Sequence, residues 1–371
     1  MATDLTQRSS ALELLDWDHL HFFVGNAKQA AHYYATAFGF HVAAYAGPET
    51  GVPGRASYLL VQNDLRFVLT SPLRPDDPAA QHITTHGDGI KDVALRVPDA
   101  TAAFAEAVGA GARAVAEPKR IEDPNGAVVL ATIATYGDTV HTFVERDAYT
   151  GPFLPGFVPV AAGPAAPHTP GLRAIDHCVG NVGWNEMDSW ADFYGKTFGF
   201  SQLVSFDDSD ISTEYTALRS KVMSDARRRV KFPINEPAEG LKKSQIEEYL
   251  DAYRGAGVQH VAIATDDIVA AVRALRANGV QFLETPGSYY DALGTRVGHI
   301  DEAIDVLREL SILVDRDDLG YMLQIFTKPL QDRPTLFFEI IQRRGSLSFG
   351  KGNFKALFVS IEEEQAKRGN L

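Results

Sequence analysis

The sequence is poor in cysteine, in positive charge and in long apolar runs, and each shortage excludes something. Among 371 residues there is one cysteine, Cys178, so no intrachain disulfide can form and a reducing compartment is expected. The net charge of −13 argues against nucleic acid or an anionic membrane as a partner. No stretch approaches the ~18 apolar residues of a membrane span, and the N-terminus lacks the pattern of a signal peptide. We therefore expect a cytoplasmic protein.

The order of strand-like and helix-like segments repeats along the chain. Residues 15–24 alternate as a strand does, residues 28–38 favour a helix, and three strand-like runs follow at 40–46, 56–62 and 65–70. The same β-α-β-β-β order restarts near residues 86, 173 and 255. This pattern predicts an α+β protein of four tandem β-α-β-β-β units that form two similar domains, and 371 residues suffice for two domains.

A proline-rich stretch separates the two halves. Residues 147–170 contain six prolines, a composition that argues against any helix or strand there. We therefore expect an N-terminal domain at residues 1–150, a linker at 151–172 and a C-terminal domain at 173–371.

An internal repeat relates the two halves directly. Residues 87–95 match residues 255–263 position by position, and residues 35–40 match residues 195–200. In this register Asp92 stands where the later copy has His260, and Val144 or Glu145 stands where it has Glu339. The early half keeps His19 after an aspartate but shows no second histidine. We expect the N-terminal domain to fold like the C-terminal one and to bind no metal.

Three polar residues in apolar strands are the candidate metal ligands: His177, His260 and Glu339. A single histidine in a strand is more often a hydrogen-bonded core residue than a ligand. Glu339, however, lies among phenylalanines and isoleucines, where an ionised carboxylate costs several kcal/mol unless a cation is beside it. Two histidines and one carboxylate suit a non-haem Fe(II) site, and zinc is also open. Cys178 points to the opposite face of its strand and is expected in the core.

Several motifs in the C-terminal half carry a resemblance to a known family. They are Phe232 to Pro237, Lys243 to Ile246, Gly255 to His260, Leu323 to Pro329, Gln331 to Pro334, Phe337 to Ile341 and Phe349 to Phe354. In these motifs the sequence is similar to the 4-hydroxyphenylpyruvate dioxygenases, of the bacterial type, which have the vicinal oxygen chelate (glyoxalase-like) fold. The resemblance implies one Fe(II) per chain and the conversion of 4-hydroxyphenylpyruvate and dioxygen to homogentisate and carbon dioxide, a step of tyrosine and phenylalanine catabolism.

The resemblance also implies roles for residues around the metal. Phe326 and Phe354 are expected to stack on the substrate ring, and Gln324 enters the same cavity because it lies two residues before Phe326 on one strand. These three are the candidate catalytic residues. The expected substrate-binding residues are Ser220, Asn235, Gln245, Pro233, Phe337 and Phe349. Strand alternation predicts that Gln259 faces away from the site.

The end of the chain is expected to cover the site. Residues 354–368 have the pattern of an amphipathic helix, with apolar residues on one side and an acidic run on the other. In the family a C-terminal helix acts as a lid, and a homo-oligomer (dimer or tetramer) is expected.

Two other functions remain open at this point. One is 4-hydroxymandelate synthase, which shares fold, metal and substrate, although Phe354 and Asn235 favour the dioxygenase. The other is a metal-free binding protein of the same fold, against which the three ligand residues argue.

Overall fold

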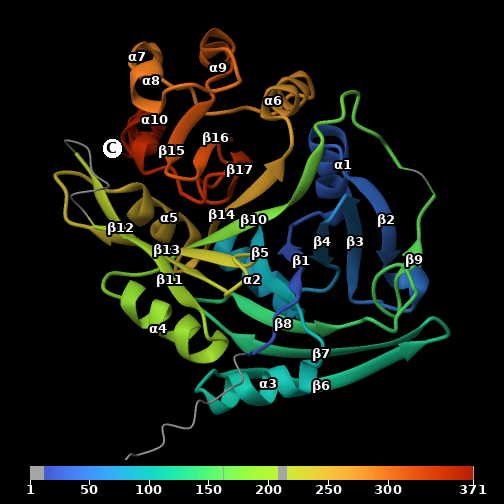
Figure 1. Ribbon diagram of the computed structural model, residues 1–371. Coiled ribbons are helices and arrows are strands. Elements are labelled where there is room, and N and C mark those ends of the chain that lie inside the picture. Colours follow the sequence, from blue (N-terminus) through green and yellow to red (C-terminus); the bar gives the residue numbers. More distant parts are fainter. Residues whose placement is uncertain (1–11, 162, 208–214, 371) are drawn as a thin grey trace, which may run out of the picture.

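The computed structural model describes residues 12–161, 163–207 and 215–370, which form two large twisted sheets (Figure 1). The N-terminal sheet has the strand order β6-β7-β8-β5-β1-β4-β3-β2-β9, and the C-terminal sheet has the order β11-β12-β13-β10-β14-β17-β16-β15. In both sheets the first strands of two successive units pair antiparallel at the centre, β1 with β5 and β10 with β14. The two halves are thus built on one plan.

The expected four units are present. In the N-terminal half they are β1 (Asp16–Phe23), α1 (Ala27–Phe38), β2 (His41–Ala46), β3 (Arg55–Gln62), β4 (Leu65–Pro72), and then β5 (Gly89–Arg96), α3 (Ala100–Gly109), β6 (Ala114–Asp123), β7 (Gly126–Ala134), β8 (Val140–Glu145). In the C-terminal half they are β10 (Leu172–Asn181), α4 (Met187–Phe198), β11 (Ser201–Phe206), β12 (Ala217–Ser224), β13 (Lys231–Ala238), and then β14 (Gly257–Thr265), α6 (Ile268–Ala277), β15 (Leu313–Asp317), β16 (Gly320–Phe326), β17 (Phe337–Arg344).

Local sequence signals set the limits of the repeated helices. Asn26 caps the N-terminus of α1 by accepting a hydrogen bond from the backbone of Gln29, and Asp99 caps α3 in the same way. The helices α1 and α4 both end at a glycine in the left-handed region, Gly39 at φ 75° and Gly199 at φ 67°. Because equivalent helices begin and end at similar capping residues, the repeat can be recognised in the sequence.

Several elements were not expected from the sequence. They are the helices α2 (Pro78–His86), α5 (Gln245–Tyr253), α7 (Gly287–Asp291), α8 (Leu293–Val297) and α9 (Ile304–Leu310), the short 3-10 turns η1 (Pro48–Thr50) and η2 (Lys351–Asn353), and the strand β9 (Val158–Pro159). Of these, α5 carries a readable signal, because Ser244 and Glu247 form a capping box at its start.

The strand β9 corrects the interpretation of the proline-rich stretch as free of regular structure. Val158 pairs with Tyr45 and Pro159 with Ala44 of β2, at the outer edge of the N-terminal sheet. An edge position tolerates proline because one side of the strand needs no amide donor. Part of the linker is therefore attached to the N-terminal sheet.

One hydrophobic core runs through both halves. Its buried members include Phe22, Phe67 and Phe143 of the N-terminal half and Phe232 and Phe338 of the C-terminal half. Cys178 belongs to the same cluster and is fully buried, as expected. None of the helices in the described ranges is long and apolar enough to cross a membrane.

His141 lies where the two halves meet and makes stability depend on pH. Its Nδ1 donates to the carbonyl of Val93 at 2.8 Å, and its Nε2 accepts from the hydroxyl of Tyr194 at 2.8 Å. Burial lowers the pKa of His141 to about 4, although the bond to Val93 opposes this shift. The unfolded chain takes up this proton near pH 6.5 and the folded chain does so only near pH 4, so the contribution is complete above pH 6.5.

We therefore expect the contribution of His141 to be lost as the pH falls from 6.5 towards 4, by about 3 kcal/mol in total. Urea unfolding of wild type and His141→Gln between pH 4.5 and 7.5 measures it. The free energy of unfolding should fall less steeply with acidification in the variant. Parallel pH profiles for the two proteins would contradict the prediction.

Candidate metal centre and substrate pocket

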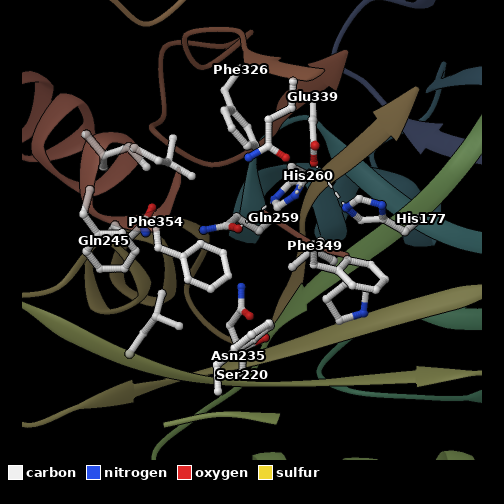
Figure 2. Close-up of a pocket in the computed structure, with 18 of the residues that line it drawn as sticks. His177, Ser220, Asn235, Gln245, Gln259, His260, Phe326, Glu339, Phe349 and Phe354 are labelled. Atoms are coloured by element: carbon white, nitrogen blue, oxygen red, sulfur yellow. Dashed lines mark hydrogen bonds and ion pairs between the residues drawn. The ribbon is translucent and has the colours of Figure 1, made fainter. Parts of the chain in front are cut away.

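Three strands bring His177, His260 and Glu339 together. They come from β10, β14 and β17, which are neighbours in the C-terminal sheet. The Nε2 atoms of His177 and His260 lie 3.2 Å and 3.5 Å from the same oxygen, Oε2 of Glu339. All three side chains are buried or nearly so, and Figure 2 shows them turned toward one another. One metal ion can take a ligand atom from each.

The hydrogen bonds of the two imidazoles leave their lone pairs aimed at the carboxylate. His177 donates from Nδ1 to Asp176 at 2.7 Å, and His260 donates from Nδ1 to Oε1 of Gln259 at 2.9 Å. Each Nε2 of the neutral ring therefore carries a lone pair that faces Glu339. Three electron-pair donors that converge in a buried space call for a cation.

Glu339 also needs positive charge beside it. Burial by itself would raise the pKa of Glu339, but protonated His177 and His260 outweigh burial and lower the pKa to about 2. Burial would likewise lower the pKa of His177, but Glu339 and Asp176 outweigh it and raise this pKa, so without a metal ion a proton on the imidazole supplies the positive charge. The carboxylate is therefore ionised at neutral pH. Its second oxygen, Oε1, is buried without a hydrogen-bond partner, so this atom has unused ligand capacity. The residues present fit a divalent metal.

The repeat places a different set of side chains at the matching position of the N-terminal half. Strand pairing puts Asp92 opposite Val140 and Leu95 opposite Phe143, so Thr142 lies opposite Ala94, as Glu339 lies opposite Ala262. The counterpart of Glu339 is therefore Thr142, and the assignment to Val144 or Glu145 was wrong by two or three residues. Asp92 accepts hydrogen bonds from the amide of Thr142 at 3.0 Å and from its hydroxyl at 2.5 Å.

The N-terminal half does contain a second histidine near this position. His21, two residues after His19 on β1, lies with His19 and Asp92 in a group whose ligand atoms are within 4.8 Å of one another. The expectation that no second histidine would be present was therefore wrong. Nevertheless, Nε2 of His21 already bonds to the hydroxyl of Thr70 at 2.7 Å, and both Asp92 oxygens accept from Thr142. His21 and Asp92 of this group therefore already have hydrogen-bond partners within the chain.

A cavity of about 640 Å³, including its open mouth, lies against the three candidate ligands. Apart from the candidate ligands, its polar lining residues are four side-chain amides and a serine. The remaining walls are mainly aromatic and aliphatic. All the residues expected at the site line it: Ser220, Pro233, Asn235, Gln245, Gln324, Phe326, Phe337, Phe349 and Phe354, with His177, His260 and Glu339. In Figure 2 the rings of Phe326 and Phe354 reach into the cavity from different elements, β16 and the C-terminal helix.

Gln259 also lines the cavity, contrary to the expectation that it faces away. The cause is a β-bulge. Val179 of β10 pairs with His260, whereas the next residue, Gly180, pairs with Val258, so Gln259 has no partner in the register and the alternation breaks. Gln259 is 4% exposed and orients His260 through the hydrogen bond described above.

Further apolar residues line the cavity, and sequence reasoning missed those on the strands. The strand residues are Val179, Phe206, Leu218 and Val222, and those on the expected lid helix are Leu357, Phe358 and Ile361. Leu357, Phe358 and Ile361 belong to α10 (Phe354–Lys367), and their spacing places them on one side of that helix. Most others lie two residues from a polar lining residue on the same strand, so strand alternation could have found them.

The C-terminal helix α10 covers one side of the cavity and is tied to the body at its far end. Arg368, just beyond α10, forms hydrogen-bonded ion pairs with the buried Glu248 of α5, the shortest at 2.7 Å. Near its start, Phe354 packs edge-on against Phe206 with ring centroids 4.9 Å apart. The described helix is therefore in the position expected of a lid.

Comparisons with known proteins agree with this architecture. Residues 18–129 and 174–325 each match family models described as the Glyoxalase/Bleomycin resistance protein/Dioxygenase superfamily. The chain is 50% identical over 367 residues to a protein of Yarrowia lipolytica named 4-hydroxyphenylpyruvate dioxygenase, covering 96% of this chain and 93% of that one. A protein of the same name from Dictyostelium discoideum is 50% identical over 96% of this chain and 99% of its own length.

A solved structure resembles the chain closely. It is a triple mutant of 4-hydroxymandelate synthase from Streptomyces coelicolor, with a TM-score of 0.86 and 34% identity, covering 95% of this chain and 100% of that one. The relatives of about 50% identity named above are eukaryotic, so the bacterial type inferred from the sequence is not borne out.

Proposed function

The chain belongs to the 4-hydroxyphenylpyruvate dioxygenase family, and on that premise we propose that it converts 4-hydroxyphenylpyruvate and dioxygen to homogentisate and carbon dioxide. The observation that carries the proposal is the convergence of two imidazoles on one ionised, partly unpartnered carboxylate at the wall of an aromatic cavity. Two histidines and a carboxylate would hold a divalent metal and would leave it open positions for a chelating keto acid and dioxygen.

We propose Fe(II) as the metal, held by His177, His260 and Glu339 with one ion per chain. Iron, when bound, supplies the redox chemistry of the reaction. The N-terminal half is proposed to hold none, because Thr142 stands in the place of Glu339 and satisfies Asp92. Anaerobic titration of metal-free protein with Fe(II), followed by metal analysis, tests the ratio. Two tightly bound ions per chain would contradict it.

The chain's own residues bind and orient the substrate. Phe326 and Phe354 offer ring faces on which a planar phenol can stack. The side chains of Ser220, Asn235 and Gln245 line the part of the cavity away from the ligands and can hydrogen-bond a phenolic hydroxyl without adding charge beside the metal (Figure 2). Gln259 lies closer to the ligands, bonded to His260, and Gln324 lines the cavity from the same strand as Phe326. Pro233, Phe337 and Phe349 complete the walls.

A single assay tests the proposed activity. Protein reconstituted with Fe(II) is mixed with 4-hydroxyphenylpyruvate and dioxygen, and the product is identified by chromatography and mass. Homogentisate as the main product supports the proposal. Formation of 4-hydroxymandelate instead would favour the second candidate function, 4-hydroxymandelate synthase. The similarity to the Streptomyces coelicolor synthase is the observation that favours this candidate. No turnover with tight ligand binding would point to a binding protein.

The lid position of α10 leads to a prediction about efficiency. Removing residues 354–371 takes away Phe354, Leu357, Phe358 and Ile361 from the cavity wall, so water gains access to the reaction. We expect dioxygen consumption per homogentisate formed to rise about two- to threefold or more. Oxygen-electrode measurements combined with product quantification provide the ratio.

A milder variant separates the lid from general packing. Arg368→Gln removes the ion pairs to Glu248 and leaves every cavity residue in place. It should show a smaller rise in the same ratio. If the ratio of dioxygen consumed to homogentisate formed is unchanged in both variants, α10 contributes to packing and does not act as a lid.

We further propose a homo-oligomer, dimer or tetramer, in the cytoplasm, as the sequence suggested. Analytical ultracentrifugation of the full chain determines the oligomeric state.

A further inference from the structure

The guanidinium of Arg343 lies directly behind the candidate ligand His177. Its Nε donates to Oδ1 of Asp176 at 2.8 Å, and its Nη2 donates to Oδ2 at 2.9 Å. Oδ2 is also the atom that accepts from Nδ1 of His177 at 2.7 Å. Because the planar fork fixes the plane of the carboxylate, it also fixes the direction in which the imidazole presents Nε2.

The same guanidinium holds a segment that forms part of the cavity wall. Its Nη1 donates to the carbonyls of Ser346 at 3.2 Å and Ser348 at 2.7 Å, and it lies over the ring of Phe349 at 5.5 Å. Phe349 lines the cavity and contacts His177 edge-on at 5.3 Å. The segment 346–349 then leads through η2 into α10.

We propose that Arg343 is a positioning residue that couples the metal ligand His177 to the segment 346–349 of the cavity wall. One side chain orients the imidazole through Asp176 and fastens the segment that carries Phe349 and precedes the lid. Loss of Arg343 therefore weakens metal binding and loosens the wall together. This inference rests on the proposed metal site.

Other groups around Asp176 and the segment do not replace this link. Lys231 lies 3.2 Å from Oδ1 of Asp176 and supplies charge there, but no contact with segment 346–349 is found for it among the described residues. On its other side the segment is held by Asp317, whose Oδ2 accepts from the amides of Leu347 and Ser348. Only Arg343, in the described ranges, touches both Asp176 and the carbonyls of the segment.

The N-terminal half contains a copy of this arrangement and so provides a matched control. Arg146 donates to Asp18 at 2.7 Å and to the carbonyl of Phe153 at 2.6 Å, and it lies over the Phe153 ring at 4.7 Å. Asp18 in turn accepts from His19 at 2.6 Å. The pattern resembles that of Arg343, with one hydrogen bond to the carboxylate in place of two, and this half is proposed to hold no metal. Arg146→Gln therefore removes a similar amount of packing and charge without touching the metal site.

The experiment compares Arg343→Gln, Arg343→Lys and Arg146→Gln with wild type in the full chain. Metal affinity is measured by competition of Fe(II) with a chelator and by titration with Co(II), whose visible absorption reports the ligand geometry. Limited proteolysis measures the exposure of residues 345–353. We expect Arg343→Gln to weaken metal binding about 10- to 100-fold, to alter the Co(II) spectrum and to speed cleavage at this segment.

The two remaining variants separate orientation from stability. Arg343→Lys keeps a charge beside Asp176 but lacks the fork, so it should recover part of the metal affinity and leave the segment as exposed as in Arg343→Gln. Arg146→Gln should lower the thermal midpoint and leave metal affinity within about twofold of wild type. The proposal is overturned if folded Arg343 variants bind metal as wild type does, or if Arg146→Gln weakens it equally. Wild type that binds no metal at all would instead refute the proposed function.

Discussion

Replacing Glu339 by alanine is expected to lower the affinity for Fe(II) by more than about 100-fold and to abolish measurable turnover. Glu339 is the only carboxylate of the triad, and its Oε2 lies 3.2 Å and 3.5 Å from the two imidazole nitrogens. Changes to residues that merely orient ligands cost 10- to 100-fold in affinity, so loss of the anionic ligand itself should exceed that range. Competition with a chelator and homogentisate assays at saturating iron measure the two effects.

Glu236 provides the control for this prediction. It is also a buried glutamate of the C-terminal sheet, 3% exposed. In the structure it pairs with Arg219 at 3.0 Å and accepts from the amide of Met187, and it lies outside the cavity lining. Glu236→Ala should therefore destabilise the fold and keep metal affinity. Wild-type turnover of Glu339→Ala at limiting Fe(II) would show that another carboxylate is the ligand.

The repeated architecture could be predicted because its signals are local. The strand period, the Asn26 and Asp99 caps and the glycines that end α1 and α4 recur at corresponding places, so the four units are visible in a single sequence. The clustering of the three candidate ligands could be predicted for a related reason. A glutamate inside an apolar strand is costly, and its burial at 2% exposure agrees with that expectation.

The errors arose where the strand register departs from regular alternation or depends on partners far away in sequence. Strict strand alternation predicted that the side chain of Gln259 faces away from the cavity. A bulge opposite Val179 and Gly180 turns this side chain toward the cavity instead. Thr142 was missed because the counterpart of Glu339 depends on how β5 and β8 align, which neither strand specifies by itself. His21 joins His19 and Asp92 through tertiary proximity.

The three short helices between α6 and β15 could not be predicted for a different reason. The helices α7, α8 and α9 are five to seven residues long, too short for a clear 3.6-residue period. They are stabilised by tertiary contacts instead. The hydroxyl of Tyr289 accepts from the amide of Val314 and also bonds to Asn353, the residue before α10. Local sequence patterns do not reveal such contacts, because the contacting residues lie far apart in the sequence.

Replacing Phe354 by isoleucine is expected to divert part of the product from homogentisate to 4-hydroxymandelate or to another incompletely rearranged product. Phe354 lines the cavity at the start of α10, and its ring projects toward the interior (Figure 2). Attack on the ring and attack on the benzylic carbon compete from one bound substrate, so the product ratio depends on how the ring is held. Loss of one aromatic stack is worth roughly 0.5 to 1.5 kcal/mol, and a difference of about 1.4 kcal/mol between two barriers changes the ratio tenfold.

Phe358 supplies a comparison on the same helix. Its ring also lines the cavity, but it is 3% exposed and packs in a cluster with Phe206, Leu218 and Ile246. Phe358→Ile removes the same volume from α10, and because Phe358 is not expected to stack on the substrate ring, it should lower stability and divert less product than Phe354→Ile, while iron binding stays intact in both variants. Chromatography of the two reaction mixtures decides between the roles. Homogentisate as the sole product of Phe354→Ile at an unchanged rate would mean that Phe354 does not contact the substrate ring, and equal diversion in both variants would mean that α10 acts through packing alone.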